Sequence, residues 1–281
     1  MKTKLFLMRS TKQTKTSSTK KIEVDTLFIK EILSYYKKLG RHDLVWRKKI
    51  SPYKILVSEI MLQQTQVARV IPKFKEWMKK FPSLTVLSKS SLSEILILWQ
   101  GLGYQRRAKA LLAIAKQTST LPKSYEKLLA LPGIGSYTAG ALMAFAYDAF
   151  SHPVLETNIR TVLIEYFHPG ETDIHDGLLY DDLSRLVTYQ EVKGVGARHF
   201  YYALMDRGAH LKANKISHNS KSAHHTTQSR YEGSLRQLRA KTLFAITHKE
   251  AVPVDERLGV VISQLIKEEY IIKKGKGYVI L

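Results

Sequence analysis

One short stretch of the chain places a single carboxylate among apolar residues. It reads Ser58-Glu59-Ile60-Met61-Leu62-Gln63-Gln64-Thr65-Gln66-Val67, so Glu59 comes just before a dense run of amides and a hydroxyl. Burial raises the pKa of a carboxyl group, and a carboxylic acid that is protonated near neutral pH can act as a general acid. Glu59 could equally be a core acid that pairs with a backbone N–H or a basic side chain, because structural ion pairs also perturb pKa values. The pattern alone leaves both interpretations open.

We expect Glu59 to lie on a deeply buried helix that begins near Pro52. Ser51 is a favourable N-cap, and proline is favourable at the first helical position. Apolar side chains cover most of the circumference of this helix, namely Ile55, Leu56, Val57, Ile60, Met61 and Leu62. A carboxylate in such a helix must either find a partner or keep its proton.

A second motif predicts two helices joined by a tight turn. Residues 131–141 read Leu-Pro-Gly-Ile-Gly-Ser-Tyr-Thr-Ala-Gly-Ala, and apolar residues precede and follow them. Gly133 and Gly135 allow positive φ and let backbone N–H groups approach an anion at the N-terminus of the second helix. Such a turn can hold a phosphate whatever the nucleotide sequence, although a plain helical hairpin has the same pattern.

Together these motifs resemble the helix-hairpin-helix DNA glycosylases of the endonuclease III-like superfamily, and within it most of all the adenine DNA glycosylase (MutY) family. The resemblance covers roughly residues 46–209 and implies a mainly α fold of two subdomains. The matching motifs occur in this order: Trp46-Arg47, Pro52-Tyr53-Lys54, the run 58–67, Trp99 with Gly101-Leu102-Gly103-Tyr104, the turn 131–135, and Ala203-Leu204-Met205-Asp206 with Gly208-Ala209.

The resemblance implies three catalytic positions. Glu59 falls on the glutamate that protonates the purine and activates water. Tyr137 falls where lyase-competent relatives carry lysine, and without that amine no Schiff base forms, so strand cleavage should be weak or absent. A second carboxylate should stabilise the cationic sugar, as in two-carboxylate glycoside cleavage. The family uses an aspartate there; this chain has Glu156, which could instead be a capping acid at a helix start.

The resemblance also implies DNA contacts. Gln63 falls on the residue that wedges into the base stack, Gln64 on a contact to the opposite strand, and Tyr104 on the aromatic that intercalates beside the lesion. The turn glycines fall on the phosphate-binding turn. Asn158 is also expected to bind DNA, and either Asn158 or Thr157 could cap a helix over 159–167. Tyr202 falls on the base-pocket position. It could stack on a flipped base, form a hydrogen bond to it, or be part of the core.

Composition limits the partners and cofactors. The net charge of +21 favours a polyanion, and we expect double-stranded DNA with a mismatch or an oxidised base; the alternative is a solvated basic surface. The chain has no cysteine, which excludes thiolate metal sites, including the iron–sulfur cluster that many relatives hold after the segment matching Gly208-Ala209; we expect no cofactor. No apolar run approaches the ~18 residues of a membrane span. We expect an intracellular monomer, cytoplasmic and nucleoid-associated if bacterial.

Composition shifts divide the chain into four parts. Residues 1–22 carry seven Lys or Arg and no acid, and we expect a disordered basic tail. Residues 23–210 are predicted to form the glycosylase domain, and 211–230 a polar basic linker, whose histidines have no common metal-ligand spacing. Residues 231–281 show two helical patterns and then a strand-turn-strand pattern around Gly275-Lys276-Gly277, which indicates a small winged-helix-like module.

Three functional hypotheses follow. The first is a monofunctional DNA glycosylase that removes adenine opposite 8-oxoguanine or guanine. The second changes the base to a mismatched thymine or uracil, because Tyr137 and Tyr202 leave the base open. The third is a non-catalytic DNA-binding protein, for which the replacement of aspartate by Glu156 is the only support.

Overall fold

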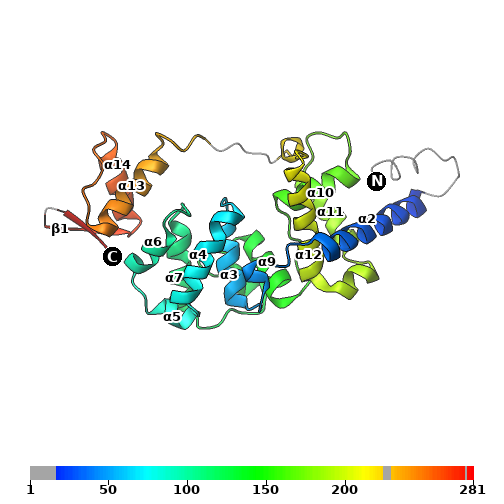
Figure 1. Ribbon diagram of the computed structural model, residues 1–281, viewed down its shortest axis with the longest axis horizontal. Helices are drawn as coiled ribbons and strands as arrows, with labels where there is room; N and C mark the ends of the chain where they lie inside the picture. Colours follow the sequence, from blue (N-terminus) through cyan, green and yellow to red (C-terminus); the bar gives the residue numbers. More distant parts are fainter. Residues whose placement is uncertain (1–16, 224–228, 276) are drawn as a thin grey trace. The chain divides into compact units, whose positions relative to one another are not determined.

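The computed structural model describes residues 17–223, 229–275 and 277–281, and the chain is mainly helical, as predicted (Figure 1). Its described residues form two compact units. The first unit combines residues 17–40 with 157–223, and the second combines 41–156 with 229–281 apart from 276. No helix among the described residues is both long and apolar enough to cross a membrane.

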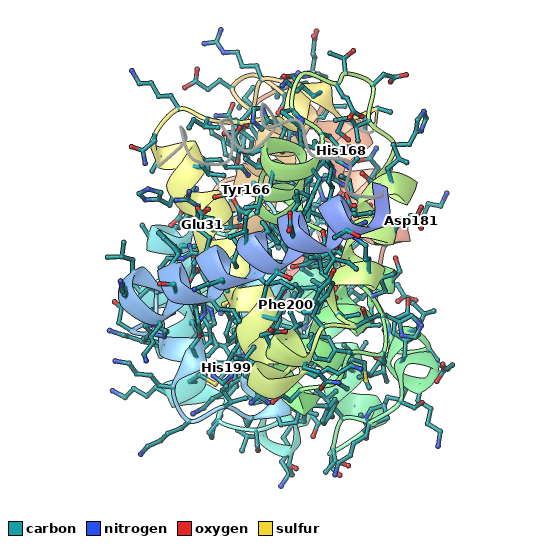
Figure 2. All side chains as sticks on the ribbon, turned by 90° about the vertical axis from the view of Figure 1, so that its right-hand side faces the viewer. Glu31, Tyr166, His168, Asp181, His199 and Phe200 are labelled. Atoms are coloured by element: carbon teal, nitrogen blue, oxygen red, sulfur yellow. The ribbon has the colours of Figure 1, made fainter. Side chains whose placement is uncertain are left out.

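The first unit is a bundle around two consecutive helical segments that meet at Gly196, whose φ of 80° and ψ of 164° are not helical. Its helices are α2 (Ser17–Leu39), α10 (Thr157–Phe167), α11 (Asp176–Leu186), α12 (Gln190–Ala213) and the short 3-10 helix η2 (Asn219–Lys221). Both α2 and α10 pack against α12. In Figure 2, Glu31 of α2 lies beside Tyr166 of α10, and Arg207 of α12 donates to both, at 3.0 Å to the Glu31 carboxylate and 2.9 Å to the Tyr166 hydroxyl.

Part of the predicted tail is helical. Residues 1–16 lie outside the described residues, but residues 17–22 form the first turns of α2, so the disordered-tail prediction is wrong for them. The physical reason is that helix formation is cooperative, and the buried face of Phe28, Ile29 and Ile32 supports helix growth back through Lys20 and Lys21.

The predicted linker is also largely folded. Helix α12 continues to Ala213, and backbone bonds join Ile174 to Lys221 and Ala223. The His218 imidazole lies 2.6 Å from the Glu165 carboxylate of α10. Polar composition therefore misassigned residues 211–223, because their side chains and backbone find partners within the first unit.

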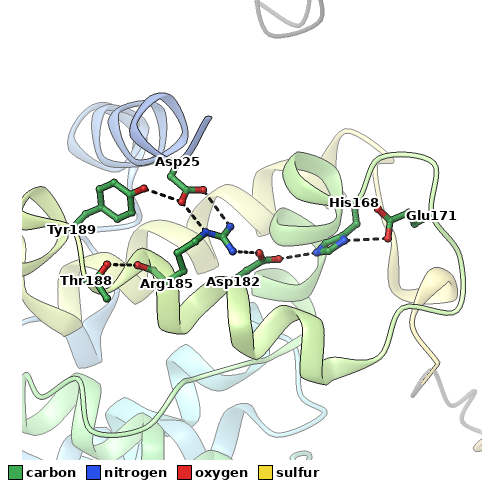
Figure 3. Close-up of polar contacts among 7 residues, drawn as sticks. All are labelled: Asp25, His168, Glu171, Asp182, Arg185, Thr188 and Tyr189. Atoms are coloured by element: carbon green, nitrogen blue, oxygen red, sulfur yellow. Dashed lines mark hydrogen bonds and ion pairs between the residues drawn. The ribbon is translucent and has the colours of Figure 1, made fainter. Parts of the chain in front are cut away.

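A buried ionic network ties α2 to α11 (Figure 3). Asp25 is fully buried and accepts from Arg185 Nε at 2.7 Å and from the Tyr189 hydroxyl at 3.0 Å. Arg185 also pairs with Asp182 at 2.7 Å, and Asp182 lies 2.7 Å from the His168 ring. Each charge is thereby partnered, as burial requires.

We expect Asp25→Asn to lower the free energy of unfolding by about 1–3 kcal/mol, because the amide keeps the shape but loses the charge-assisted bonds from Arg185. Urea denaturation checks this. Asp181→Asn is the matched control, since Asp181 is exposed on α11 next to buried Asp182 (Figure 2). Equal destabilisation by both variants would contradict the prediction.

The second unit is built around one buried helix. Its first part contains η1 (Val45–Arg47), α3 (Pro52–Leu62), α4 (Val67–Lys80), α5 (Leu84–Ser88), α6 (Leu92–Trp99), α7 (Arg106–Gln117), α8 (Tyr125–Leu129) and α9 (Ser136–Tyr147). Helix α3 packs against η1, α4, α7 and α9. It begins as predicted, with the Ser51 side chain accepting from the Lys54 N–H and Pro52 in the first turn.

The second unit also contains a C-terminal module, residues 229–281. It consists of α13 (Leu235–His248), α14 (Leu258–Lys267) and the antiparallel strands β1 (Ile271–Lys274) and β2 (Gly277–Ile280). Ile271 pairs with Ile280, and Gly275 in the turn has φ of 60°. The two helices and the hairpin are confirmed. Among the described residues of the module no third helix occurs, so the name winged helix stays unconfirmed.

Candidate active site

The acid of the first motif is buried inside the second unit. Glu59 of α3 is 6 % exposed, and its Oε2 accepts a hydrogen bond from the Tyr137 hydroxyl of α9 at 3.1 Å. Burial is the main cause that raises the pKa of Glu59 to about 7; the Tyr137 bond lowers that pKa, the charge of Glu156 raises it and Arg47 lowers it. Much of the Glu59 population therefore carries a proton near neutral pH.

The second carboxylate lies close enough to act on the first. Glu156 ends an irregular segment that follows buried Val154 and Leu155, and its charge contributes to the raised pKa of Glu59. The structure thus brings together Glu59, Tyr137 and Glu156, which the sequence places far apart. A proton donor beside a second carboxyl group is the arrangement that most glycoside-cleaving enzymes use.

The predicted helix caps are wrong. Helix α10 starts at Thr157, so Thr157 and Asn158 both lie within its first turn and neither is its N-cap. The first turn of α10 packs closely against α12, where a Cβ on Gly208 would stand 2.2 Å from the Asn158 carbonyl oxygen. The residue before the helix is Glu156, at a place where a carboxylate is favoured by the helix dipole.

The pH dependence of Glu59 yields a testable expectation for its partner. Because the Tyr137 hydrogen bond lowers the pKa of Glu59, Tyr137→Phe should raise that pKa above about 7. If Glu59 is the acid of the base excision that the sequence leads us to expect, the alkaline limb of its single-turnover rate should move to higher pH. Tyr147→Phe, near the other end of α9, removes a bond to the Leu121 carbonyl instead and should leave the limb in place. A shift of the limb to lower pH would contradict this reasoning.

Polar residues that follow α3 extend the site outward. The Gln63 side-chain amide donates to the Thr138 hydroxyl of α9 at 3.2 Å, which orients it toward the two-glycine turn. Gln64 is exposed and has a positive φ of 55°. Gln63, Pro132 and Gly133 line one cavity of about 650 Å³.

The two-glycine turn joins α8 to α9, as predicted. Gly133 has φ of 72°, and a Cβ there would meet the Ala110 Cβ at 2.6 Å, so only glycine fits. Gly135 is the N-cap of α9 with φ of −94°, and a Cβ there would meet nothing within 4 Å. The N-terminus of α9 is therefore open above Gly135, which leaves room for an anion to approach its N–H groups.

The loop that carries Tyr104 is held from one side by two arginines. Tyr104 has φ of 47°, and the guanidinium carbons of Arg106 and Arg107 lie 5.8 and 5.6 Å from its ring centroid. Gly101 and Gly103 have φ of 84° and 70°. Such a loop presents an aromatic ring in a backbone conformation that non-glycine residues seldom adopt.

Comparison with known proteins places this geometry in a family. The sequence matches the HhH-GPD superfamily of base excision DNA repair proteins over residues 57–255. The chain belongs to this superfamily. An adenine DNA glycosylase from Buchnera aphidicola subsp. Baizongia pistaciae is 44% identical over 146 residues, which cover 50% of this chain and 41% of that protein. One from Mycolicibacterium smegmatis is 42% identical over 144 residues, 49% of this chain and 48% of that protein. The chain spans about half the length of the curated relatives it matches.

Solved structures agree with the HhH-GPD fold. A thermostable thymine-DNA glycosylase has a TM-score of 0.60 and 25% sequence identity, and the match covers 72% of this chain and 93% of that one. A trapped endonuclease III–DNA intermediate has a TM-score of 0.52 at 16% identity, covering 76% of this chain and 92% of that chain. The predicted fold class is thereby confirmed.

The iron–sulfur cluster of many HhH-GPD proteins does not fit this chain. The sequence contains no cysteine, and α12 runs on as a helix past Gly208 to Ala213, where those relatives place the cluster. Within the ranges that the structure describes, no group of three or more histidine or acidic side chains is placed to hold a metal ion.

Two predicted residues belong to the first unit, whereas Glu59, Tyr137 and Glu156 belong to the second. Tyr202 is 4 % exposed on α12, and Asn158 lies in the first turn of α10. Their roles in base and DNA binding stay predictions.

Sequence reasoning missed one residue that organises the site. Arg107 is 6 % exposed; its guanidinium donates to the carbonyl of Ile60 at 2.7 Å and that of Leu102 at 2.7 Å, and also to those of Met61, Gln63 and Gly103. It thus caps the C-terminal end of α3 and fixes the Tyr104 loop. The one hint in the sequence was that Arg107 lies three positions after Tyr104, the last residue of the motif Gly101-Leu102-Gly103-Tyr104. Arg47 was quoted within the Trp46-Arg47 match, but its electrostatic effect on Glu59 had no sequence signal.

Proposed function

We propose that this HhH-GPD protein is a monofunctional DNA glycosylase that hydrolyses the N-glycosidic bond of adenine mispaired with 8-oxoguanine or guanine. The carrying observation is Glu59, buried with a pKa of about 7 beside the charge of Glu156. The naming of its relatives as adenine DNA glycosylases, at 34% to 44% identity, supports adenine as the target. The net charge of +21 supports duplex DNA as the partner, bound by a monomer.

The proposed reaction follows from the two carboxyl groups. The adenine is first extruded from the duplex, because its bond to the sugar is inaccessible in the stack. Glu59 gives its proton to a purine ring nitrogen, the C1′–N9 bond breaks, and the electron pair leaves with the base. The Glu156 carboxylate stabilises the cationic sugar. Water then adds to C1′ and returns one proton to Glu59, which restores the acid.

We further propose that the enzyme has little or no lyase activity. Lyase chemistry needs an amine that attacks C1′ and forms a Schiff base, and the corresponding position holds Tyr137, whose hydroxyl is bonded to Glu59. Borohydride should trap no protein–DNA adduct. A trapped adduct would contradict this part of the proposal.

The deciding experiment is a panel of duplexes with A·8-oxoG, A·G, T·G and U·G pairs, treated with the purified chain and then with alkali. Alkali-dependent nicking at the A pairs supports the proposal, and no excision from any A pair overturns it. The second candidate is a thymine or uracil mismatch glycosylase, favoured by the likeness to the thymine-DNA glycosylase structure. It would nick only the T·G or U·G strands. Binding without nicking of any strand would favour a non-catalytic DNA-binding protein.

A further inference from the structure

The C-terminal module reaches the aromatic residue that the first part of the second unit presents. Arg236 of α13 donates from Nη1 to the Tyr104 hydroxyl at 2.9 Å. Its other terminal nitrogen donates to the Ser229 carbonyl at 2.7 Å, and its guanidinium carbon lies 5.9 Å from the Tyr231 ring centroid. The guanidinium is therefore held in place by its own module while it contacts Tyr104.

Two further contacts fix the module on either side of the Tyr104 loop. Before the loop, the Gln100 side-chain amide lies 3.4 Å from the ring nitrogens of His248 at the end of α13. After the loop, the Lys109 ammonium donates to the Glu268 carbonyl and lies 5.2 Å from the Tyr270 ring centroid. The module thus contacts the chain before, at and after the residues that set the position of Tyr104.

The loop needs such support. Tyr104 has a positive φ, and the loop contains two positive-φ glycines, so its backbone has few intrinsic preferences that would fix the ring. Arg107 holds the loop carbonyls from within the first part of the unit. Arg236 is the contact from the module to the phenol oxygen itself.

We propose that the C-terminal module is a positioning element, which acts through Arg236 to hold the Tyr104 ring ready for insertion into the base stack of duplex DNA. This inference rests on the proposed function. An inserted ring occupies the gap that an extruded base leaves and so favours the extruded state. The expected contribution is one charge-assisted hydrogen bond that is needed while the base is out of the stack.

The test compares Arg236→Ala, Tyr104→Phe and the double variant in the full chain. Tyr104→Phe keeps the ring and the module but removes the oxygen that Arg236 contacts. Each single variant should slow single-turnover excision of A opposite 8-oxoG by about ten-fold, and the double variant should be no slower than either. Fluorescence of 2-aminopurine at the target position should report less extrusion of the base in these variants than in the wild type. Their thermal midpoints of unfolding should equal that of the wild type. Arg230→Ala is the matched control, because it removes the same charge from the same module at an exposed side chain that forms an ion pair with Glu232.

Two outcomes overturn the inference: Arg236→Ala behaves like Arg230→Ala in excision and fluorescence, or the effects of Arg236→Ala and Tyr104→Phe multiply. Hydrogen exchange without DNA separates this failure from that of the proposed function. If the wild type excises no adenine, the proposed function fails. Even then, faster exchange of the amides of residues 101–107 in Arg236→Ala than in the wild type would support the positioning role of the module. Unchanged exchange of these amides would contradict the positioning role, whichever base the enzyme excises.

Discussion

Glu59→Gln should abolish adenine excision while the protein still binds the mismatched duplex. The amide has almost the same shape but no proton to give to the purine, and it cannot take a proton from water. A positioned acid–base group typically raises the reaction rate by about 10²–10⁴-fold, so we expect the single-turnover rate to fall by at least about 10²-fold. Binding should persist because the DNA contacts predicted at Gln63 and the two-glycine turn remain.

The control for this variant is Glu76→Gln on α4, which changes a half-exposed carboxylate that pairs with Lys73. It should leave excision unchanged. A Glu59→Gln protein that keeps more than about a tenth of the rate would contradict a role for Glu59 as the acid.

The same variant should flatten the dependence of stability on pH. The pKa of Glu59 is about 7 in the folded chain and 4.5 in its ordinary state, so the folded protein binds the proton more tightly. That stabilisation is fully present below about pH 4.5 and is lost as the pH rises to about 7, at roughly 1.4 kcal/mol per pH unit. Urea midpoints measured across this window should fall in the wild type by more than in Glu59→Gln.

Gly208→Ala should strongly destabilise the protein. A Cβ at Gly208 of α12 would stand 2.2 Å from the Asn158 carbonyl oxygen and 2.6 Å from its carbonyl carbon. Those are backbone atoms in the first turn of α10, so no side chain can turn aside and the two helices must separate. Overpacking of this kind costs about 3 kcal/mol or more, which urea denaturation would register.

Gly194→Ala, in the helical segment that precedes the non-helical Gly196, gives the control. Nothing lies within 4 Å of its added Cβ, and its φ is not positive. The alanine should therefore stabilise the protein by up to about 1 kcal/mol, through helix propensity and a less flexible unfolded chain. If both variants lowered the urea midpoint equally, close approach at Gly208 would not be the cause.

The sequence predicted the parts of the site that are local. Ser51 and Pro52 mark the start of α3, and the glycines at 133 and 135 mark the turn between α8 and α9, because capping and positive φ act over a few residues. The resemblance then supplied Glu156, whose charge does act on Glu59. These features could be predicted without knowing how the chain packs.

Contacts between distant residues could not be predicted. The Tyr137 hydroxyl reaches Glu59 across 78 positions, and Arg107 reaches the carbonyl of Ile60 across 47. A guanidinium that binds backbone carbonyls does not require any particular residue types as its acceptors, since every residue has a carbonyl, so the sequence does not reveal such a contact. The start of α10 was also misplaced: local propensity favoured a cap at Asn158 or Thr157, whereas the helix already begins at Thr157.

The order of segments in the first unit has a consequence for synthesis. Its helix α2 is made early, but the helices it packs against begin only at Thr157, after the whole stretch 41–156 of the second unit. At roughly 5–20 residues per second, the apolar face of Phe28, Ile29 and Ile32 waits on the order of ten seconds for its partners on the ribosome. While residues 157–213 are being made, the stretch that carries both Glu59 and Glu156 is already complete, so the acid pair can assemble on a nascent chain in which α2 has not yet packed against α10 and α12.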